Sequence, residues 1–250
     1  MDYNDWQAIK NHYYLGSRNS GPSKALRGDV VVINILVNDY MSNWMYPAHV
    51  MEYQNAFNAM SVKLMTAAAA SGASLAIRSV FYQVNLPAVA DAGCRWLPNV
   101  FQSLGYANTE DMQRRHEQAY SCDETPIIIG FNRPMRSFAI VDNAKNIIRF
   151  SDETSVVFRH LHGFFDPTVF EHELLHQFGA VDYYYPDSTV RAAQKYFPAS
   201  IMYQGGPEID DLTRYLIGWT DELTPKAIAF LKETSDVDEL ALMRARMRGI

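Results

Sequence analysis

The sequence predicts an α/β (α+β) protein in which a twisted mixed sheet is backed by one long helix. Val30–Val37 is an almost continuous run of β-branched and aliphatic residues, which is typical of a buried strand. Pro47 then begins a helical stretch that extends to about Ser71 and ends at Gly72, and Leu75–Val84 returns as a second strand. A strand, a long helix and another strand in this order favour helices packed on a sheet.

The remaining elements are shorter and are indicated by apolar runs between turn residues. In chain order they are helices at 88–104 and 108–119, strands at Ile127–Phe131, Ser137–Val141 and Ser155–Arg159, a helix from Asp166, an irregular stretch at 182–206, and closing helices at 208–218 and 224–249. The C-terminal part is therefore expected to be smaller, mostly helical and irregular. In the long helix, the large apolar residues at helical spacing are predicted to be core: Met51, Phe57, Met60, Leu64 and Met65.

Composition indicates a globular chain with one core and excludes several classes of protein. Of the 250 residues, 48% are hydrophobic and 20% are charged, which excludes intrinsic disorder and a disulfide-dense miniature fold. The 22 lysines and arginines and 28 aspartates and glutamates give a net charge of −6. Because such a field repels polyphosphate on average, no nucleic-acid partner is expected.

The sequence does not determine the cellular compartment of the protein. No apolar run reaches the roughly 18–20 residues of a membrane-spanning helix, so no membrane span is expected. Met1–Trp6 is acidic where a signal peptide would be basic. The chain is then cytoplasmic, is exported without a cleaved leader, or is secreted after removal of a leader that preceded Met1. Cys94 and Cys122 form no metal-binding cysteine pair, and thiols are expected rather than a disulfide.

The segment Phe170–Gly179 contains the candidate metal-binding and catalytic residues of the sequence. His172 and His176 are four residues apart, so on a helix they project from one face, one turn apart. Two imidazoles in this arrangement can bind one tetrahedral zinc ion, and Glu173 beside them can act on its bound water. Chance produces this pattern in only about 1 in 100 chains of this length and composition. The competing interpretation is a surface helix that happens to carry two histidines, and it is the less favoured one.

The residues that precede the motif predict where its helix begins. Asp166 and Pro167 form a good cap and first-turn pair, and Thr168 with Glu171 fits a capping box. Gly179 can adopt the positive φ that ends a helix, so the chain can turn back toward the metal.

Asp182 is the first side chain after that turn able to coordinate a metal. The alternative is a third ligand from a later helix, for which Glu208, Asp210 and Asp211 are available. Asp182 fits the glycine turn better, and the acidic trio is predicted to begin a helix instead. His160 and His162 could bind metal in principle, but a turn before Gly163 is the favoured interpretation.

His172–Asp182, followed by Ser200-Ile201-Met202-Tyr203, resembles the metzincin metallopeptidases. The pattern of that family is HExxHxxGxxH/D followed by a methionine-containing turn (the Met-turn) beneath the metal. The resemblance covers residues 166–207. It implies one catalytic Zn²⁺ with ligands His172, His176 and Asp182, the general base Glu173, and Met202 in the Met-turn.

The resemblance also implies a single catalytic domain over residues 1–250. Residues 1–28 would be an N-terminal appendage, 29–179 an upper subdomain with the sheet and the active-site helix, and 180–250 a lower subdomain with the Met-turn. In this family an edge strand of the sheet pairs with an extended polypeptide substrate, and Ser137–Val141 or Ser155–Arg159 could be that strand.

The sequence departs from the family pattern at two positions. The third ligand is an aspartate where most members have histidine. Tyr203 directly follows the methionine, so the tyrosine ligand found two residues after it in the astacin branch is missing, and Gln204 stands there. Tyrosines near the site are candidates for pocket or transition-state residues: Tyr183, Tyr185 and Tyr203, with Tyr184 beside them. The alternative is that Tyr183–Tyr185 simply form a wall of the cleft.

The sequence therefore predicts a zinc-dependent endopeptidase that uses a metal-activated water and a glutamate base. Two alternatives stay open. One is a catalytically silent module that holds a metal and binds peptide, and the other is a zinc hydrolase of a non-protein amide such as a peptidoglycan stem. Neither the substrate nor the oligomeric state follows from the sequence.

Overall fold

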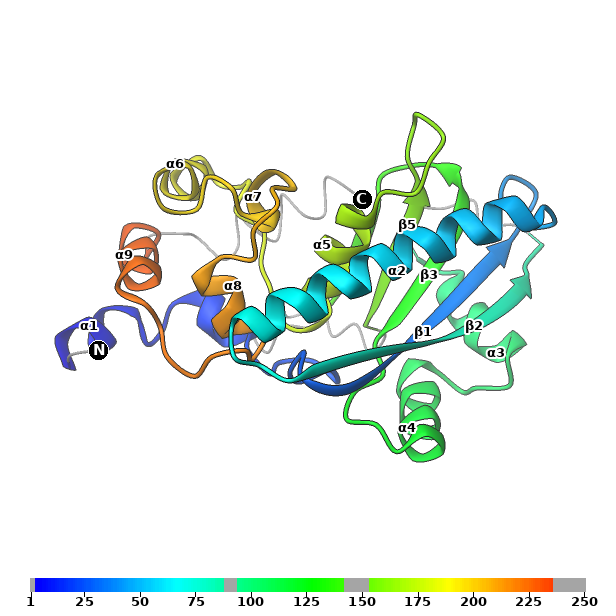
Figure 1. Ribbon diagram of the computed structural model, residues 1–250, viewed down its shortest axis with the longest axis horizontal. Coiled ribbons are helices and arrows are strands. Elements are labelled where there is room, and N and C mark those ends of the chain that lie inside the picture. The colour runs from blue at the N-terminus through cyan, green and yellow to red at the C-terminus, as the bar shows by residue number, and fades with distance from the viewer. Residues whose placement is uncertain (1–2, 88–93, 142–152, 236–250) are drawn as a thin grey trace.

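The computed structural model describes residues 3–87, 94–141 and 153–235 (Figure 1). Over these residues the protein is an α/β fold with a five-stranded mixed sheet, nine α-helices and one short 3-10 helix. The strands are β1 (Gly28–Asn38), β2 (Leu75–Asn85), β3 (Ile127–Pro134), β4 (Phe138–Ile140) and β5 (Thr154–Arg159). The predicted α/β class is confirmed, and all five predicted strands are present with bounds that differ by a few residues.

The strands lie in the order β2-β1-β3-β5-β4. Neighbouring strands are parallel except β4, which runs antiparallel to β5 at the edge of the sheet. β1 pairs with β2 along its whole length, from Gly28 opposite Leu75 to Asn38 opposite Asn85. β1 is buried on both faces over eight consecutive residues, which explains why its sequence is aliphatic without alternation.

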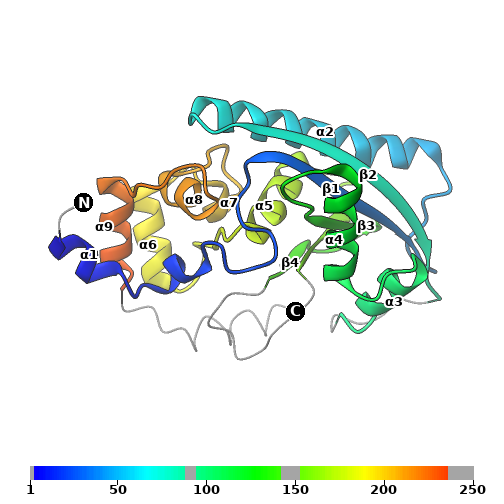
Figure 2. The ribbon, with the colours of Figure 1, turned by 90° about the horizontal axis from the view of Figure 1, so that it is seen from below.

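Helices cover both faces of the sheet (Figure 2). On one face lie the long helix α2 (Pro47–Ala70) and helix α5 (Pro167–Gln177), which packs against α2, β5 and β4. On the other face, α3 (Leu97–Ser103) and α4 (Thr109–Tyr120) cover a second apolar cluster that contains Ile33, Ile129 and Phe131. Since both faces are covered, the central strands are excluded from water.

The core positions predicted for α2 are correct in its middle and wrong at its start. Phe57, Met60 and Leu64 are buried, and Met65 is half-buried. Met51 is 59% exposed, because it lies on the side of the helix opposite the buried ring of Tyr53.

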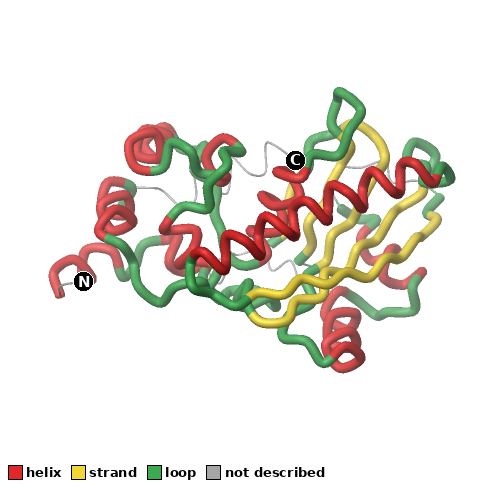
Figure 3. The backbone as a smooth tube through the Cα atoms, viewed as in Figure 1, coloured by secondary structure: helices red, strands yellow, loops and turns green. Residues whose placement is uncertain are grey.

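The C-terminal part contains more helix than predicted. Its helices are α6 (Asp187–Tyr196), α7 (Ile201–Gln204), α8 (Asp211–Leu216) and α9 (Pro225–Glu233). The expectation of an irregular stretch at 182–206 is wrong, since α6 and α7 lie within it. α6 is a short polar helix whose inner face of Thr189, Ala192 and Ala193 packs against α9, so tertiary contact rather than an apolar pattern stabilises it. Figure 3 shows these helices and loops beside the half of the molecule that holds the strands.

Two predicted helices extend beyond the described residues. Of the helix expected at 88–104, residues 88–93 lie outside them and α3 is the described part. The helix expected at 224–249 corresponds to α9, which ends at Glu233, and residues 236–250 lie outside the described part.

No helix within the described ranges is long and apolar enough to cross a membrane. Cys94 and Cys122 are thiols and form no disulfide, as expected.

The N-terminal segment, predicted as an appendage, contributes to the main core. It contains α1 (Tyr3–Ile9) and a 3-10 helix, η1 (Tyr13–Ser17). Ile9, Tyr14 and Leu26 are fully buried, and the ring of Tyr14 stacks on Phe230 of α9. The backbone N–H of Leu26 also donates to the carbonyl of Ile217 (2.9 Å). Residues 3–28 therefore pack as part of the C-terminal half.

Glu124 is a buried carboxylate that holds the loop before β1. Its Oε1 accepts from the backbone N–H groups of Lys24 (2.9 Å) and Ala25 (3.2 Å). Burial raises the pKa of Glu124 from 4.5 to about 7, against these hydrogen bonds, which lower it. The folded protein therefore binds this proton more tightly than the unfolded chain does. Its contribution to stability is complete below about pH 4.5 and is lost as the pH rises through about 7.

Glu124→Gln keeps an acceptor oxygen but removes the titration. Between about pH 4.5 and about pH 7 the wild type should lose about 1–3 kcal/mol of unfolding free energy that Glu124→Gln retains. Urea unfolding over this range measures the difference. Glu222→Gln, an exposed glutamate, is the control and should follow the wild type. Equal pH slopes for wild type and Glu124→Gln would contradict the assignment.

Candidate metal centre

Helix α5 begins where the sequence predicts, but its cap differs in one detail. Asp166 is the N-cap residue, and its Oδ1 accepts from the backbone N–H of Thr168 (2.8 Å). Glu171 does not complete the predicted capping box. It is fully buried and pairs with Lys63 of α2 (2.5 Å), because α5 packs against α2.

Buried polar contacts fix α5 against the sheet on its other side. The side chain of Gln177 accepts from the N–H of Ile127 (3.1 Å) and donates to its carbonyl (2.9 Å) at the start of β3. Ser155 of β5 donates to the carbonyl of Glu173 (2.7 Å). These contacts set the rotation of α5 about its axis, and with it the direction in which its two histidines point.

Gly179 turns the chain directly after α5. Its φ is +92°, and a Cβ at this position would lie 2.4 Å from the carbonyl oxygen of Ser17. Only glycine fits this conformation and this close approach. The prediction of a positive-φ residue here is confirmed, and the chain returns so that Asp182 faces the two histidines.

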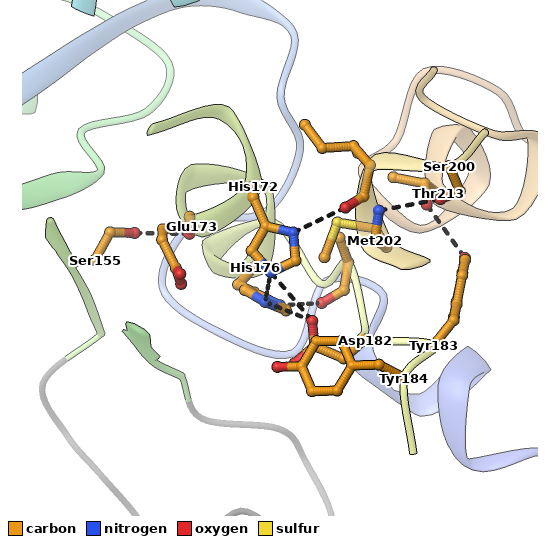
Figure 4. A network of polar contacts seen from close by, with 12 residues as sticks. Ser155, His172, Glu173, His176, Asp182, Tyr183, Tyr184, Ser200, Met202 and Thr213 are labelled. Atoms are coloured by element: carbon orange, nitrogen blue, oxygen red, sulfur yellow. Dashed lines mark hydrogen bonds and ion pairs between the residues drawn. The ribbon is translucent and has the colours of Figure 1, made fainter. Parts of the chain in front are cut away.

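The side chains of His172, His176 and Asp182 converge on one point (Figure 4). The Oδ1 atom of Asp182 lies 3.2 Å from the Nε2 atom of each histidine, and the two Nε2 atoms are 3.3 Å apart. A tetrahedral zinc ion with bonds of about 2.0–2.1 Å keeps its ligand atoms about 3.3 Å apart. The three atoms therefore have the spacing of three corners of a zinc tetrahedron.

Backbone carbonyls hold both imidazoles in one orientation. The Nδ1 atom of His172 lies 3.0 Å from the carbonyl oxygen of Ile201, and that of His176 lies 2.8 Å from the carbonyl oxygen of Ala180. Because a carbonyl only accepts, each Nδ1 carries the hydrogen, and each Nε2 can present its lone pair to a metal. One carbonyl comes from the Met-turn and the other from the turn after Gly179.

The three side chains are strongly coupled in charge. Burial lowers the pKa of His172, but the hydrogen bond and charge of Asp182 outweigh it and raise that pKa to about 9. Burial raises the pKa of Asp182, yet the two imidazoles hold it well below its ordinary value. The carboxylate is thus charged and His172 protonated at neutral pH. Since a metal ligand must give up its proton, metal binding here releases protons.

Glu173 lies beside the triad with a carboxylate atom that has no partner. The residue is buried, and its Oε2 makes no hydrogen bond to any described residue. Burial raises its pKa, although the neighbouring imidazoles lower it. A buried carboxylate with an unsatisfied oxygen and a raised pKa is suited to accepting a proton.

The residues of the predicted Met-turn lie beside His172 (Figure 4). Met202 is fully buried, and its backbone N–H donates to the Ser200 hydroxyl (3.0 Å). That hydroxyl donates to Oδ2 of Asp210 (2.6 Å), which also accepts from the hydroxyl of Thr213 (2.7 Å). Asp210 thus anchors the turn that supplies the Ile201 carbonyl. It caps α8 as predicted and takes no place among the ligand atoms.

The candidate tyrosines lie in different surroundings. Tyr183 is fully buried, and its hydroxyl lies 3.2 Å from that of Thr213 in the C-terminal core, so it does not face the triad. Tyr203 is also buried in that core, and Tyr185 is half-exposed. Tyr184 is the tyrosine at the site: its hydroxyl donates to Oδ2 of Asp182 (2.6 Å). Three consecutive tyrosines gave no signal for which of them faces the ligands.

The other acidic and histidine candidates lie apart from this cluster. Among the described residues, His172, His176 and Asp182 form the group with metal-ligand spacing. His160 and His162 lie in a turn that is closed by a hydrogen bond from the N–H of His160 to the carbonyl of Phe164 (2.7 Å).

No known protein family matches the chain, and no curated protein sequence is significantly similar to it.

Tyr184→Phe removes the hydroxyl that orients the third ligand. Zinc affinity should fall about tenfold or more, the usual cost of losing a hydrogen bond to a ligand. Competition with a chromophoric chelator measures the affinity, and Tyr185→Phe is the adjacent control that should bind zinc as the wild type does.

Asp182→Ala removes the third candidate ligand and should retain no zinc after dialysis. Zinc retained by Asp182→Ala at wild-type affinity would show that this triad is not the site.

Asp210→Ala removes the acceptor for the hydroxyls of Ser200 and Thr213. The unfolding free energy should fall by about 2–4 kcal/mol, and zinc affinity should fall with it, because the Ile201 carbonyl loses its anchor. The matched variant is Asp211→Ala, whose side chain is half-buried and should cost less than about 1 kcal/mol. Urea unfolding and chelator competition on both variants measure the effects. Equal losses for the two aspartates would contradict the anchoring role.

Proposed function

We propose that this protein is a zinc-dependent endopeptidase of metzincin type. The observation that carries the proposal is the triangle of ligand atoms from His172, His176 and Asp182, with edges of 3.2, 3.2 and 3.3 Å. Three protein ligands leave the fourth position of a tetrahedral zinc for water or substrate, as in catalytic rather than structural sites. The Asp182 Oδ1 atom is buried, and its only close polar neighbours among the described residues are the two Nε2 atoms at 3.2 Å, which a shared metal would bridge.

Glu173 is the general base of the proposed reaction. A zinc ion held by His172, His176 and Asp182 would supply Lewis acidity toward the scissile carbonyl and the attacking water. Glu173 accepts a proton from that water as its oxygen attacks the carbonyl carbon. The same carboxyl then donates the proton to the amide nitrogen as the C–N bond breaks, which releases a carboxylate and an amine. The free Oε2 and the raised pKa of Glu173 support both steps.

Strand β4 offers a place for an extended polypeptide. It is the edge strand, it is antiparallel to β5, and α5 with the triad packs against it. No described strand pairs with its outer edge, and a substrate strand added there would hydrogen-bond through its backbone, so that the scissile bond would pass the candidate ligands. This position supports Ser137–Val141 over Ser155–Arg159 as the pairing strand, because β5 already has strands on both sides.

Glu173 also bears on the two alternatives. A silent peptide-binding module needs the metal ligands but no base, whereas this chain keeps a buried carboxylate beside them at a desolvation cost. A hydrolase of a non-protein amide would use the same residues, so the substrate separates it from a peptidase.

Glu173→Ala should lower the cleavage rate of an unfolded protein substrate by at least about 10²-fold while leaving zinc content unchanged. The wild type should cleave such a substrate, lose activity with a chelator and regain it with zinc. Cleavage is followed by electrophoresis and mass spectrometry, and zinc by elemental analysis.

Glu222→Ala, an exposed glutamate away from the triad, is the matched control and should cleave normally. Cleavage that survives Glu173→Ala would overturn the proposed mechanism. A zinc-loaded wild type that cleaves no peptide bond would support a silent module or a non-peptide hydrolase.

A further inference from the structure

Arg136 is a cation at the candidate site that belongs to neither the ligand set nor the general base. It lies in the loop between β3 and β4, two residues before the edge strand. Its Nη2 atom is 3.3 Å from the Tyr184 hydroxyl, and its guanidinium carbon is 5.8 Å from the centre of that ring. Since Tyr184 in turn donates to Asp182, the guanidinium is one hydroxyl away from a metal ligand.

Arg136 forms no ion pair with a described carboxylate, although its charge reaches Glu173. Other arginines of the sheet are paired, as Arg78 is with Asp29 (2.5 Å) and Arg159 with Glu52 (2.7 Å). Arg136 is exposed and forms no ion pair over the described residues. Its one hydrogen bond here, to Tyr184, leaves most of its five N–H donors available.

The surroundings of Arg136 favour contact with substrate rather than with bulk water alone. Tyr184 reaches it from the chain after Gly179, so the two side chains meet across the ligand triad from opposite halves of the fold. Met135 and Tyr185, neighbours of this pair in the chain, are 47% and 39% exposed. An exposed guanidinium held by Tyr184 close to the candidate ligand Asp182 is suited to binding a planar anion.

We propose that Arg136 is a specificity residue that binds a carboxylate of the substrate close to the scissile bond. The inference rests on the proposed peptidase function and names a substrate class for it: peptides with an acidic side chain, or with a free C-terminal carboxylate, beside the cleaved bond. The guanidinium pairs with either group in the same bidentate geometry. Tyr184 acts as a positioning residue that holds the fork toward the triad.

The test uses sets of peptides that differ at one position, scanned on both sides of the scissile bond, with glutamate, glutamine or lysine there. Each set is made with a free and with an amidated C-terminus, which distinguishes a side-chain carboxylate from the terminal one. The wild type should prefer one carboxylate form by about 10- to 100-fold in kcat/KM. In Arg136→Gln the preference should fall to near unity, and in Arg136→Glu it should shift toward lysine.

Arg27→Gln is the matched control, because Arg27 is exposed just before β1 and outside the site, and it should keep the wild-type preference. Unchanged selectivity in Arg136→Gln would overturn the proposal. An equal loss for all peptides would also overturn it, since that result assigns Arg136 to the reaction step instead.

Peptide binding to zinc-loaded Glu173→Ala, followed by fluorescence anisotropy, separates this inference from the proposed function. Tighter binding of carboxylate peptides that depends on Arg136 supports the inference even if the wild type cleaves nothing. Cleavage without carboxylate preference leaves the peptidase function standing and removes the inference.

Discussion

The contact of one carboxylate with two imidazoles is the constraint on which the site depends. Asp182 lies 3.2 Å from both histidine Nε2 atoms, and charge attraction alone would not hold three side chains so precisely. Backbone carbonyls orient the imidazoles, the glycine turn brings the carboxylate back, and Tyr184 fixes its second oxygen. These groups come from residues 179–184 and from Ile201, whereas the histidines lie on α5, so the site exists only when the C-terminal half packs against this helix.

The halves are joined by buried contacts that pass directly behind the triad. The Ser17 hydroxyl donates to the carbonyl of Gly179 (2.7 Å), and Nδ1 of His172 on α5 lies 3.0 Å from the carbonyl oxygen of Ile201. The Met-turn is held from the other side through Ser200 and Asp210. A segment that begins the chain and a helix near its described end thus stabilise the same few residues.

Helix α5 is unusual because it buries several polar side chains beside the apolar Phe170, Leu174 and Leu175. Glu171, Glu173 and Gln177 are all buried, and buried polar groups cost free energy unless they are paired. Glu171 is paired with Lys63, and Gln177 is satisfied by backbone. The unsatisfied Oε2 of Glu173 lies beside the triad, and Oδ1 of Asp182 faces both imidazoles; a metal and its water would satisfy these oxygens. The uncompensated free-energy cost of burying polar groups on this helix therefore falls at the candidate metal site.

The sequence by itself determined the local features: the strands, the long helix, the N-cap at Asp166, the positive φ at Gly179, and the spacing of His172 and His176. These depend on short-range sterics and on periodicity, which neighbouring residues contain. It could not determine that α6 forms in a polar stretch, that Tyr184 rather than Tyr183 faces Asp182, or that Glu171 pairs across to α2 rather than capping its own helix. Only the tertiary structure decided these, because each depends on a partner far away in the chain whose position no local pattern encodes.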